Sequence, residues 1–487
     1  MTEPHWQRLD PRMLLIYPVK AFMRFLPALI ALFIAGSASG GVADWLRYLV
    51  IAAPIVLGVL RYLTTSYRIT PGRIELRRGL LNRHVLSTPL DRVRTVDITT
   101  PPVHRLLGLT TVRVGTGTAS TDDDDRMDLD GLPVDQARQL RAELLHASPE
   151  ELSEDTPVEQ PVLVLELSWL RFAPLTSAGL VITAGVLGVA TQAANTVGRP
   201  LRLDSDRLAG GAGAWSIWIA VPVGLVTLAV IVSALSIGGY VVTNWGFRLT
   251  HTGPPRGGAW HLRRGLLTTR ETTLDDERVR GVSVGDPLGL RLAGGARAWA
   301  IATGLESGSG SSLLVPPAPR DVVHRAAGAV LRTPGPLDTP LTGHGPRART
   351  RRYSRALVPA SLVLIGAVAL VPLAGAPWWV PAVAALGVPI ALALAADRVR
   401  ALGHALAGGY LVVRAGSLNR RKDALEVDGV IGWNLSASWF QRRAGLTTLT
   451  ATTAGGRQSV TALDIPEPDA VALAQAAHPE LLDQFLA

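Results

Sequence analysis

The chain contains no cysteine. This absence excludes disulfide bonds, thiolate-ligated zinc, iron–sulfur clusters and cysteine nucleophiles. Aromatic residues make up only 5% of the sequence, too few for the stacking platforms that bind single-stranded nucleic acid, so we expect no nucleic-acid partner. We also find no nucleophile elbow, phosphate-binding loop or His-Glu metal motif in the sequence. The sequence therefore predicts no catalytic residue, no metal site, no cofactor and no enzymatic activity.

Charged residues are scarce as well, at 18% of the 487 residues, whereas hydrophobic residues make up 48% and the mean hydropathy is +0.26. These values are high for a soluble protein and low for a chain that lies wholly in lipid, so we expect part of it in a bilayer. The formal net charge is +9, and arginine supplies most of the cations. An anionic partner would explain this charge, but so would the excess of cations in the cytoplasmic loops of membrane proteins.

A membrane-spanning helix needs about 20 mostly apolar residues. Six stretches meet this requirement, and they fall in three pairs. They run roughly from Phe25 to Gly41 and Leu46 to Leu63, from Ala173 to Ala194 and Trp215 to Tyr240, and from Ala356 to Gly375 and Trp378 to Ala396. The interruption Gly375-Ala376-Pro377 predicts a tight turn within the last pair. We therefore expect three membrane hairpins.

The distribution of cations predicts the orientation of these hairpins. Positive residues precede the first span, whereas the turns at 37–43 and 375–377 carry none, which places the N-terminus inside. Six spans then place every large domain in the cytoplasm. One connection, residues 195–213, disagrees, because it would be external and yet contains three arginines. The alternative of a cleaved signal peptide is less favoured, because a second apolar span follows the first almost at once.

The same pattern follows each hairpin. Its first part reads Arg77-Arg78-Gly79-Leu80-Leu81, then Arg263-Arg264-Gly265-Leu266-Leu267, then Arg414-Ala415-Gly416-Ser417-Leu418. A second glycine stands 29 residues after the first each time, at Gly108, Gly294 and Gly445. Ungapped agreement over this distance predicts three related domains.

Short runs in each copy alternate apolar and polar residues, as in Arg73–Leu76, which is typical of half-buried strands. A helical pattern beside a proline closes each copy, at about 134–147, 320–331 and 468–486. The predicted organisation is a tail and first hairpin (1–65), domain 1 (66–150), a linker and second hairpin (151–245), domain 2 (246–334), a linker and third hairpin (335–405), and domain 3 (406–487).

This arrangement resembles the bacterial pleckstrin-homology-like family of the second type, in particular its YdbT-like three-domain membrane members. The resemblance rests on the strand at Tyr67, the turn at Arg77–Leu81, the Arg92-Val93 pair and Leu107-Gly108-Leu109. It is strongest in the first copy and weakest in the third, which lacks the double arginine. It implies a multi-pass protein of the bacterial cell membrane with pleckstrin-homology-like β domains, each made of two packed antiparallel sheets closed by a C-terminal helix. Such domains are typically binding modules.

Cations gather at the same turn of each copy, close in sequence to a membrane helix. They are Arg77, Arg78 and Arg83, then Arg263, Arg264 and Arg270, then Arg414, Arg420, Arg421 and Lys422. Near an anionic leaflet each cation contributes about 1 kcal/mol to membrane binding, so we interpret them as candidate contacts for anionic lipid headgroups. A solvated basic turn explains the same pattern without a ligand.

Other polar patterns are weaker. The histidines, among them His84, His104 and His261, show no metal-ligand spacing. The run Asp122–Asp125 lacks the spacing of a calcium loop, so a solvated loop is the better interpretation. We expect a non-enzymatic scaffold that binds lipid headgroups, a membrane protein partner or further copies of itself. A transporter or channel is the alternative, but the predicted spans hold almost no ionisable residue that would line a pathway.

Overall fold

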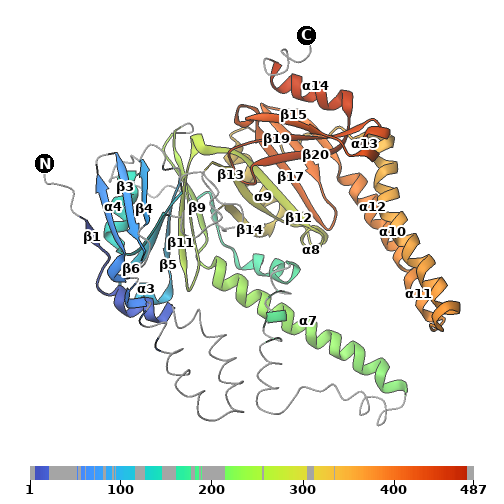
Figure 1. The fold of residues 1–487 in the computed structure, drawn as a ribbon, viewed down its shortest axis with the longest axis horizontal. Coiled ribbons are helices and arrows are strands. Elements are labelled where there is room, and N and C mark those ends of the chain that lie inside the picture. The colour runs from blue at the N-terminus through green and yellow to red at the C-terminus, as the bar shows by residue number, and fades with distance from the viewer. Residues whose placement is uncertain are drawn as a thin grey trace. The chain divides into compact units, whose positions relative to one another are not determined.

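The structure is a computed structural model (Figure 1). It describes residues 6–20, 58–144 with short gaps, 161–176, 214–254, 257–303, 312–333 and 335–479, together with a few isolated residues between 52 and 188. The chain divides into two compact units near Leu274. Each unit is described below by itself. We call residues 66–150, 246–334 and 406–487 the first, second and third β-rich segments.

The first unit begins with a four-stranded antiparallel sheet that the N-terminal residues join. Its order is β1 (Gln7–Arg8), β2 (Ser66–Thr70), β3 (Arg73–Arg78) and β4 (His84–Pro89). A helix over residues 13–20 follows β1, and its Met13 and Ile16 are buried in the same core as Ile74 and Leu76 of β3. The N-terminal residues therefore pack in one core with the first β-rich segment.

A seven-stranded sheet follows, and it contains strands of two segments. Its order is β7 (Met127–Pro133), β6 (Leu109–Gly115), β5 (Thr95–Thr100), β11 (Thr269–Asp275), β10 (Ala259–Arg264), β9 (Arg248–Thr252) and β8 (Leu163–Val164). The first three strands belong to the first β-rich segment and the next three to the second. The antiparallel pair β5 and β11 joins the two segments, with Glu271 opposite Ile98. Helices α3 (Pro102–Leu106) and α4 (Val134–Leu144) lie against β6.

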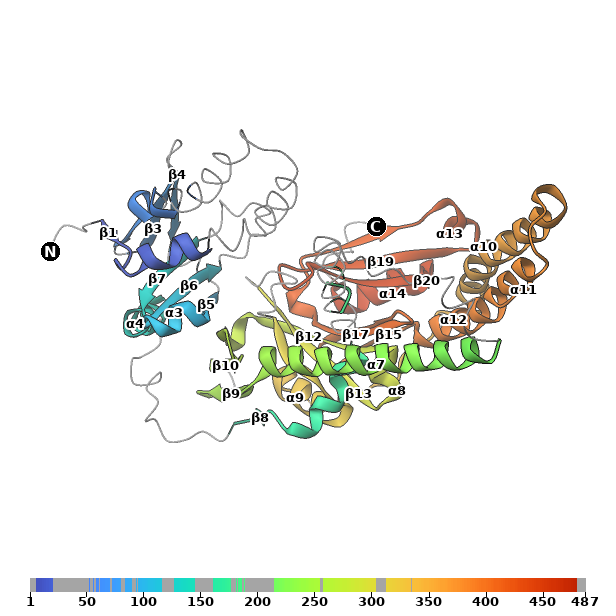
Figure 2. The same cartoon turned by 90° about the horizontal axis from the view of Figure 1, so that it is seen from below.

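The second unit repeats this plan with a six-stranded sheet (Figure 2). Its order is β14 (Leu313–Pro319), β13 (Gly295–Ala302), β12 (Val279–Pro287), β17 (Asn419–Glu426), β16 (Tyr410–Ala415) and β15 (Gly403–Ala407). Strands β12 to β14 belong to the second β-rich segment and β15 to β17 to the third. The pair β12 and β17 joins them, with Val282 opposite Ala424. Helix α9 (Arg320–Leu331) buries its apolar face against β12, β13 and β14.

The third β-rich segment ends in a separate three-stranded sheet. Its order is β18 (Gly432–Ser436), β19 (Leu446–Thr452) and β20 (Ser459–Pro466), and the short helix α13 (Trp439–Arg443) connects β18 to β19. Helix α14 (Glu467–Ala477) packs on β19 and β20. Leu411 and Leu425 share one core with Leu449, Ile465 and Leu473. Strands β16 and β17 near the start of the third segment and β19 and β20 near its end therefore share one hydrophobic core.

Among the described residues, three helical stretches are long and apolar enough to cross a membrane, at Pro222–Asn244, Gly345–Ala374 and Trp379–Ala401. The first lies in α7 (Ala214–Asn244), the second is α10 (Gly345–Ala374), and the third joins α11 (Trp379–Ala385) and α12 (Gly387–Ala401). Helix α10 packs along α12 as a hairpin (Figure 1). The predicted turn is confirmed, because α10 ends at Gly375 in a left-handed conformation, with a φ of 63°.

The other predicted spans lie mostly outside the described residues. They are Phe25–Gly41, more than half of Leu46–Leu63, and most of Ala173–Ala194 beyond Thr176. The start of the predicted span Ala173–Ala194 differs from the prediction. Ala173 lies in the 3-10 helix η5 (Leu167–Leu175), where Trp169 and Phe172 are fully buried and the Trp169 ring is 6.3 Å from that of Phe247. This apolar packing holds the start of the predicted span against the first unit.

The turn glycines found in the sequence have left-handed backbone. The φ angles of Gly79, Gly265 and Gly416 are 118°, 112° and 103°. A Cβ atom at Gly416 would strike the carbonyl oxygen of Asn419, and the same holds for Gly265 and Thr268. The sequence repeats glycine at this turn because no other residue fits without strain.

We therefore expect Gly416→Ala to destabilise the protein by about 1–3 kcal/mol, since it adds both a steric clash and a disfavoured φ. The matched control is Gly328→Ala in α9, where a Cβ atom meets open space and alanine favours the helix. Thermal unfolding of the full-length protein, followed by tryptophan fluorescence, measures both. A Gly416→Ala protein as stable as the control would contradict this account.

Candidate functional site

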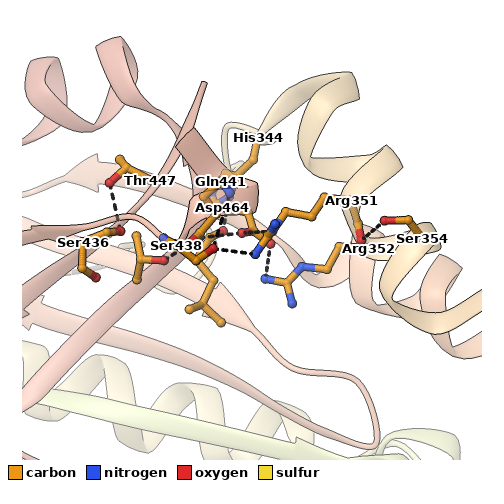
Figure 3. Close-up of polar contacts among 11 residues, drawn as sticks. His344, Arg351, Arg352, Ser354, Ser436, Ser438, Gln441, Thr447 and Asp464 are labelled. Atoms are coloured by element: carbon orange, nitrogen blue, oxygen red, sulfur yellow. Dashed lines mark hydrogen bonds and ion pairs between the residues drawn. The ribbon is translucent and has the colours of Figure 1, made fainter. Parts of the chain in front are cut away.

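A buried carboxylate joins the third β-rich segment to the start of the long apolar helix α10 (Figure 3). Asp464 of β20 is 1% exposed. Arg351 Nε lies 3.0 Å from its Oδ1 atom and Arg352 Nη2 lies 2.7 Å from Oδ2. Both arginines belong to the first turns of α10. A charged group this deeply buried is tolerated only when it is paired and hydrogen-bonded, so this contact fixes α10 to the final sheet.

Local sequence prepares the pocket around Asp464. Ser438 caps α13, and the side-chain oxygen of Gln441 accepts a hydrogen bond from the Ser438 backbone amide. The Nε2 atom of Gln441 then donates to Asp464 at 2.8 Å and to Thr448 at 2.9 Å. Asp464 itself has a φ of 55°, a conformation that aspartate adopts more readily than most residues. A β-bulge between β19 and β20 turns its carboxylate toward α10.

The first β-rich segment holds a similar cluster at the same place. Lys20, at the end of the N-terminal helix, lies 2.8 Å from Asp130 of β7. His104 of α3 bonds to the same carboxylate at 3.0 Å, and Thr111 donates to it at 2.6 Å. This cluster again connects the residues before a predicted membrane span to the final strand of the segment.

The two clusters occupy equivalent positions in the repeat. His104 and Gln441 each stand four residues before the second glycine of the pattern, and Thr111 and Thr448 each stand three residues after it. The bulge residue is Gly131 in one segment and Asp464 in the other, both with positive φ. The second segment has the apolar and fully buried Leu290 where the others have His104 and Gln441, so it cannot form the same cluster.

The charge at Asp130 is strongly stabilised. Burial alone raises the pKa of Asp130, but the hydrogen bond from His104 and the charge and hydrogen bond of Lys20 outweigh it, so the pKa lies well below its ordinary value. The contacts of the Asp130 carboxylate therefore stabilise the folded state fully above the ordinary carboxyl pKa of about 4. This stabilisation is lost as the pH falls from there through the lower pKa of the folded state. Asp130 therefore stays charged and paired with Lys20 at any physiological pH.

The basic turns contact the C-terminal ends of two of the long apolar stretches, in α7 and α12. In the first unit, the amides of Gly265 and Leu266 donate to the carbonyls of Trp245 and Val242 at 2.9 Å, at the end of α7. Arg264 is buried and donates to Asn244, the last residue of α7, at 3.3 Å. Burial and the nearby charge of Arg270 lower the pKa of Arg264 to about 10, which leaves it charged at neutral pH.

The third segment uses its basic turn in the same way. Arg414 donates to the carbonyls of Ala401 and Arg400 at 3.1 and 2.8 Å, and a cation at the C-terminus of a helix is favoured by the helix dipole. Arg420 lies 2.7 Å from Asp397 of α12, which also binds Arg291 at 3.1 Å. Several of the arginines that we interpreted as headgroup contacts therefore hold the protein's own helix.

The other candidates have different surroundings. Arg263 is 60% exposed and lies 3.4 Å from Glu271, and Arg270 is exposed. Arg77 lies over the ring of Trp6, and Arg421 over that of Trp299, at 5.8 and 5.3 Å from the ring centres. Lys422 donates to the carbonyl of Leu337. Arg78 ends β3, and Arg83 lies outside the described residues.

The comparisons agree with this architecture. A family model described as bacterial PH domain matches residues 17–148 and 360–478, together more than half of the chain. The chain belongs to this family. The two matched regions contain the first and third β-rich segments with the residues that precede them. No curated protein and no solved structure matches the chain.

Family membership fixes the coarser conclusions. The β-rich sheets of this bacterial PH domain protein are consistent with PH-like domains, its family is generally non-catalytic, and its long apolar helices fit a membrane-associated protein. Asp122–Asp125 lies outside the described residues. Within the described part of the chain, no group of three His, Cys, Asp or Glu side chains is placed to hold a metal ion.

The sequence interpretation missed both carboxylate clusters. His104 was treated as one more isolated histidine, because its partners Asp130 and Lys20 lie 26 and 84 residues away. The repeat contained a pattern that could have identified these clusters. His104 and Gln441, both able to donate to a carboxylate, fall at the same position of two copies, each with an aspartate near the end of the last strand.

Replacing Asp464 with asparagine tests whether its buried ion pairs with Arg351 and Arg352 stabilise the protein. Asparagine keeps the left-handed backbone but removes the charge, so Arg351 and Arg352 lose their buried partner and unfolding becomes easier by about 3 kcal/mol. Asp428→Asn at an exposed position is the matched control. Urea unfolding of the full-length protein in detergent measures the difference, and equal stability of the two variants would refute the role of Asp464.

The pH dependence of stability provides a second test, at His404. This buried side chain lies beside His344, with ring centres 5.2 Å apart, and burial together with that neighbour lowers the pKa of His404 to about 4. The unfolded histidine binds a proton near about 6.5, so between these values the unfolded state holds more protons and stability falls as the pH falls. We expect the melting temperature to drop less from pH 7.5 to 5.0 in His404→Gln than in the unmodified protein. His84→Gln, at an exposed position, should leave the drop unchanged.

Proposed function

We propose that the protein is a non-enzymatic scaffold with three PH-like domains, in the YdbT-like arrangement, held at the cytoplasmic face of a bacterial cell membrane. In this proposal the basic turns contact anionic lipid headgroups, and the sheets present surfaces to protein partners. The observation that carries it is the attachment of the second-segment turn to the last turn of α7. With α7 crossing the bilayer, as proposed here, the turn residues lie at the depth at which this helix leaves the lipid.

The side chains of this turn suit a membrane surface. Leu266 and Leu267 are 37% and 52% exposed, and Trp245 beside them is 47% exposed. Aromatic side chains are enriched at the boundary between lipid and water, and exposed leucines gain free energy when they leave water. Arg263 and Arg270 add two exposed cations to the same turn. Each contributes about 1 kcal/mol near an anionic leaflet.

The packing of the chain supports one side for the domains. Residues 6–20 share a core with the first segment, so both lie on the same side of the membrane. Backbone bonds between Thr342 and His404, at 2.8 and 3.1 Å, likewise bring the start of α10 and the end of α12 to one side. The cations of the N-terminal residues then favour the cytoplasm for that side.

The described spans give little support to a transporter or channel. In α10 the charged residues fall within the first eleven positions, and in α12 they are Asp397, Arg398 and Arg400 near its end. A transport pathway needs ionisable groups that face it within the bilayer. Asp397 is instead bound to Arg420 and Arg291, so its charge serves the junction with the β-rich segments.

The lipid contact is tested with a fluorescent label in a chain that has no cysteine of its own. Leu267→Cys carries the label in the full-length protein, reconstituted in nanodiscs that contain nitroxide-labelled headgroups. We expect strong quenching that increases with the fraction of anionic lipid and falls at high salt, because exposed charges are screened. Arg263→Glu with Arg270→Glu should reduce the quenching at least threefold.

The matched control is Ala259→Cys, five residues earlier on β10 than Arg264 and therefore about 17 Å away along the strand. A label there should be quenched weakly and should not respond to the charge reversal. Equal quenching at both positions, or quenching at residue 267 that ignores both charge reversal and anionic lipid, would overturn the headgroup proposal.

A further inference from the structure

Successive β-rich segments are joined in the same way at both places where the structure describes a junction. In each, the first strand of one segment's second half pairs with the last strand of the next segment's first half. These pairs are β5 with β11 and β12 with β17. The chain therefore uses one kind of strand pairing twice.

The register of the two junctions is identical when it is counted from the turn glycines. Thr100, which is 21 residues after Gly79, lies opposite Thr269, which is 4 residues after Gly265. Gly281, which is 16 residues after Gly265, lies opposite Leu425, which is 9 residues after Gly416. In both cases the two counts add up to 25. The repeat thus specifies a defined interface between neighbouring segments.

An arginine completes each junction. Arg105 donates to the carbonyl of Leu266 at 3.0 Å, and Arg291 reaches the carbonyl of Ser417 at 3.5 Å. Both arginines stand three residues before the second glycine of their segment, and both carbonyls belong to the residue after the turn glycine of the next one. Arg442 occupies the same position in the third segment and is exposed.

At the two ends of the repeat, the first half of the first segment and the second half of the third segment have no neighbouring segment with which to form such a junction. β4 is equivalent to β11 and β17, and β18 is equivalent to β5 and β12. Among the strands that the structure describes, β4 and β18 each lie at the edge of their sheet with one neighbour. An edge strand presents a row of backbone donors and acceptors that is a template for a further strand.

Neither edge has a charge or a proline within the residues that would pair, since the one proline, Pro89, is the last residue of β4. The sequences of β4 and β18, HVLSTP and GWNLS, contain no charged Asp, Glu, Lys or Arg residue. The edge strands β7 and β20 contain aspartates, and β14 contains three prolines. Charges and prolines are the means by which sheet edges avoid pairing. The edge strands β8 and β15 also lack charges and prolines, so the match in position to the internal junctions is what distinguishes β4 and β18.

Exposure of equivalent side chains shows what the missing neighbour would cover. The residue 19 positions after the turn glycine is Ile98, Val284 or Leu435. Ile98 and Val284, on the paired strands, are 5% and 4% exposed, whereas Leu435 on β18 is 40% exposed. On β4, Val85 is 55% exposed. The register of the internal junctions places Val85 directly opposite Leu435.

We propose that β18 of one copy pairs with β4 of a second copy, in antiparallel orientation and in the register of the internal junctions. Ser436 then lies opposite His84, Asn434 opposite Leu86, and Gly432 opposite Thr88, while Arg442 points toward the turn at Gly79 of the second copy. The interface joins two different surfaces, so it continues from copy to copy into a row or a closed ring. It does not depend on lipid binding by the basic turns.

Cysteine cross-linking in bacterial membranes tests this interface, since the unmodified chain has no cysteine. One chain carries His84→Cys, and a second chain with a different tag carries Ser436→Cys. Residues directly opposite each other in an antiparallel pair have Cβ atoms about 4.5–5.5 Å apart, so oxidation should join the two chains efficiently. Ser87→Cys with Ser436→Cys is the register control, three residues out of step, and should give at least tenfold less product.

A second variant keeps the cross-link and adds a charge to the edge. Val85→Lys in the His84→Cys chain should reduce the product at least fivefold, whereas Val103→Lys at an exposed position of α3 should not. Unchanged melting temperatures show that both variants fold.

The remaining outcomes each decide against the proposal. No product from cysteines that react freely with maleimide, or equal product in and out of register, would overturn the paired edge. Cross-linking only within a doubly substituted chain, or only to a different protein, would overturn the second copy as the occupant.

Discussion

Backbone hydrogen bonding between neighbouring β-rich segments is the constraint on which the rest of the structure depends. Every strand must satisfy its amides and carbonyls, and β5 and β12 do so with strands of the next segment. The fit is close at Gly281, where a Cβ atom would strike the carbonyl oxygen of Ala424. Because a sheet crosses each segment boundary, the domain drawn from the sequence and the sheet found in the structure are different units. This is why the chain divides into compact units near Leu274, inside the second segment rather than between segments.

The parts of this fold that the sequence predicts are the local ones. Turn glycines could be located because a positive φ selects glycine at one position, and the tight turn at Gly375 could be located because three residues interrupt a long apolar run. The pairing of β12 with β17 could not, because backbone hydrogen bonds leave little trace in side-chain identity. The ion pairs of Asp464 were missed for a related reason. Arg351 and Arg352 lie 113 and 112 residues away from it in the sequence, and only the fold brings them together.

The arginines of the basic turns fall into two groups. Arg414 donates to the last carbonyl of α12, Arg264 donates to the last side chain of α7, and Arg420 pairs with a carboxylate in α12. Arg263 and Arg270 of the same motif are exposed. A sequence cannot separate the two groups, since all of these arginines lie within a few residues of a turn that follows a long apolar stretch. The strand pleat separates them, because neighbouring residues on a strand face opposite sides of the sheet.

The hairpin of α10 and α12 is held by polar contacts at the start of α10 and at the end of α12. Thr342 and His404 close it with a pair of backbone bonds, Asp464 grips the first turns of α10, and Arg414 and Arg420 grip the end of α12. Two helices fastened in this way cannot slide past one another without breaking buried polar contacts. A force that tilts the hairpin therefore also acts on the sheets to which both helices are fastened.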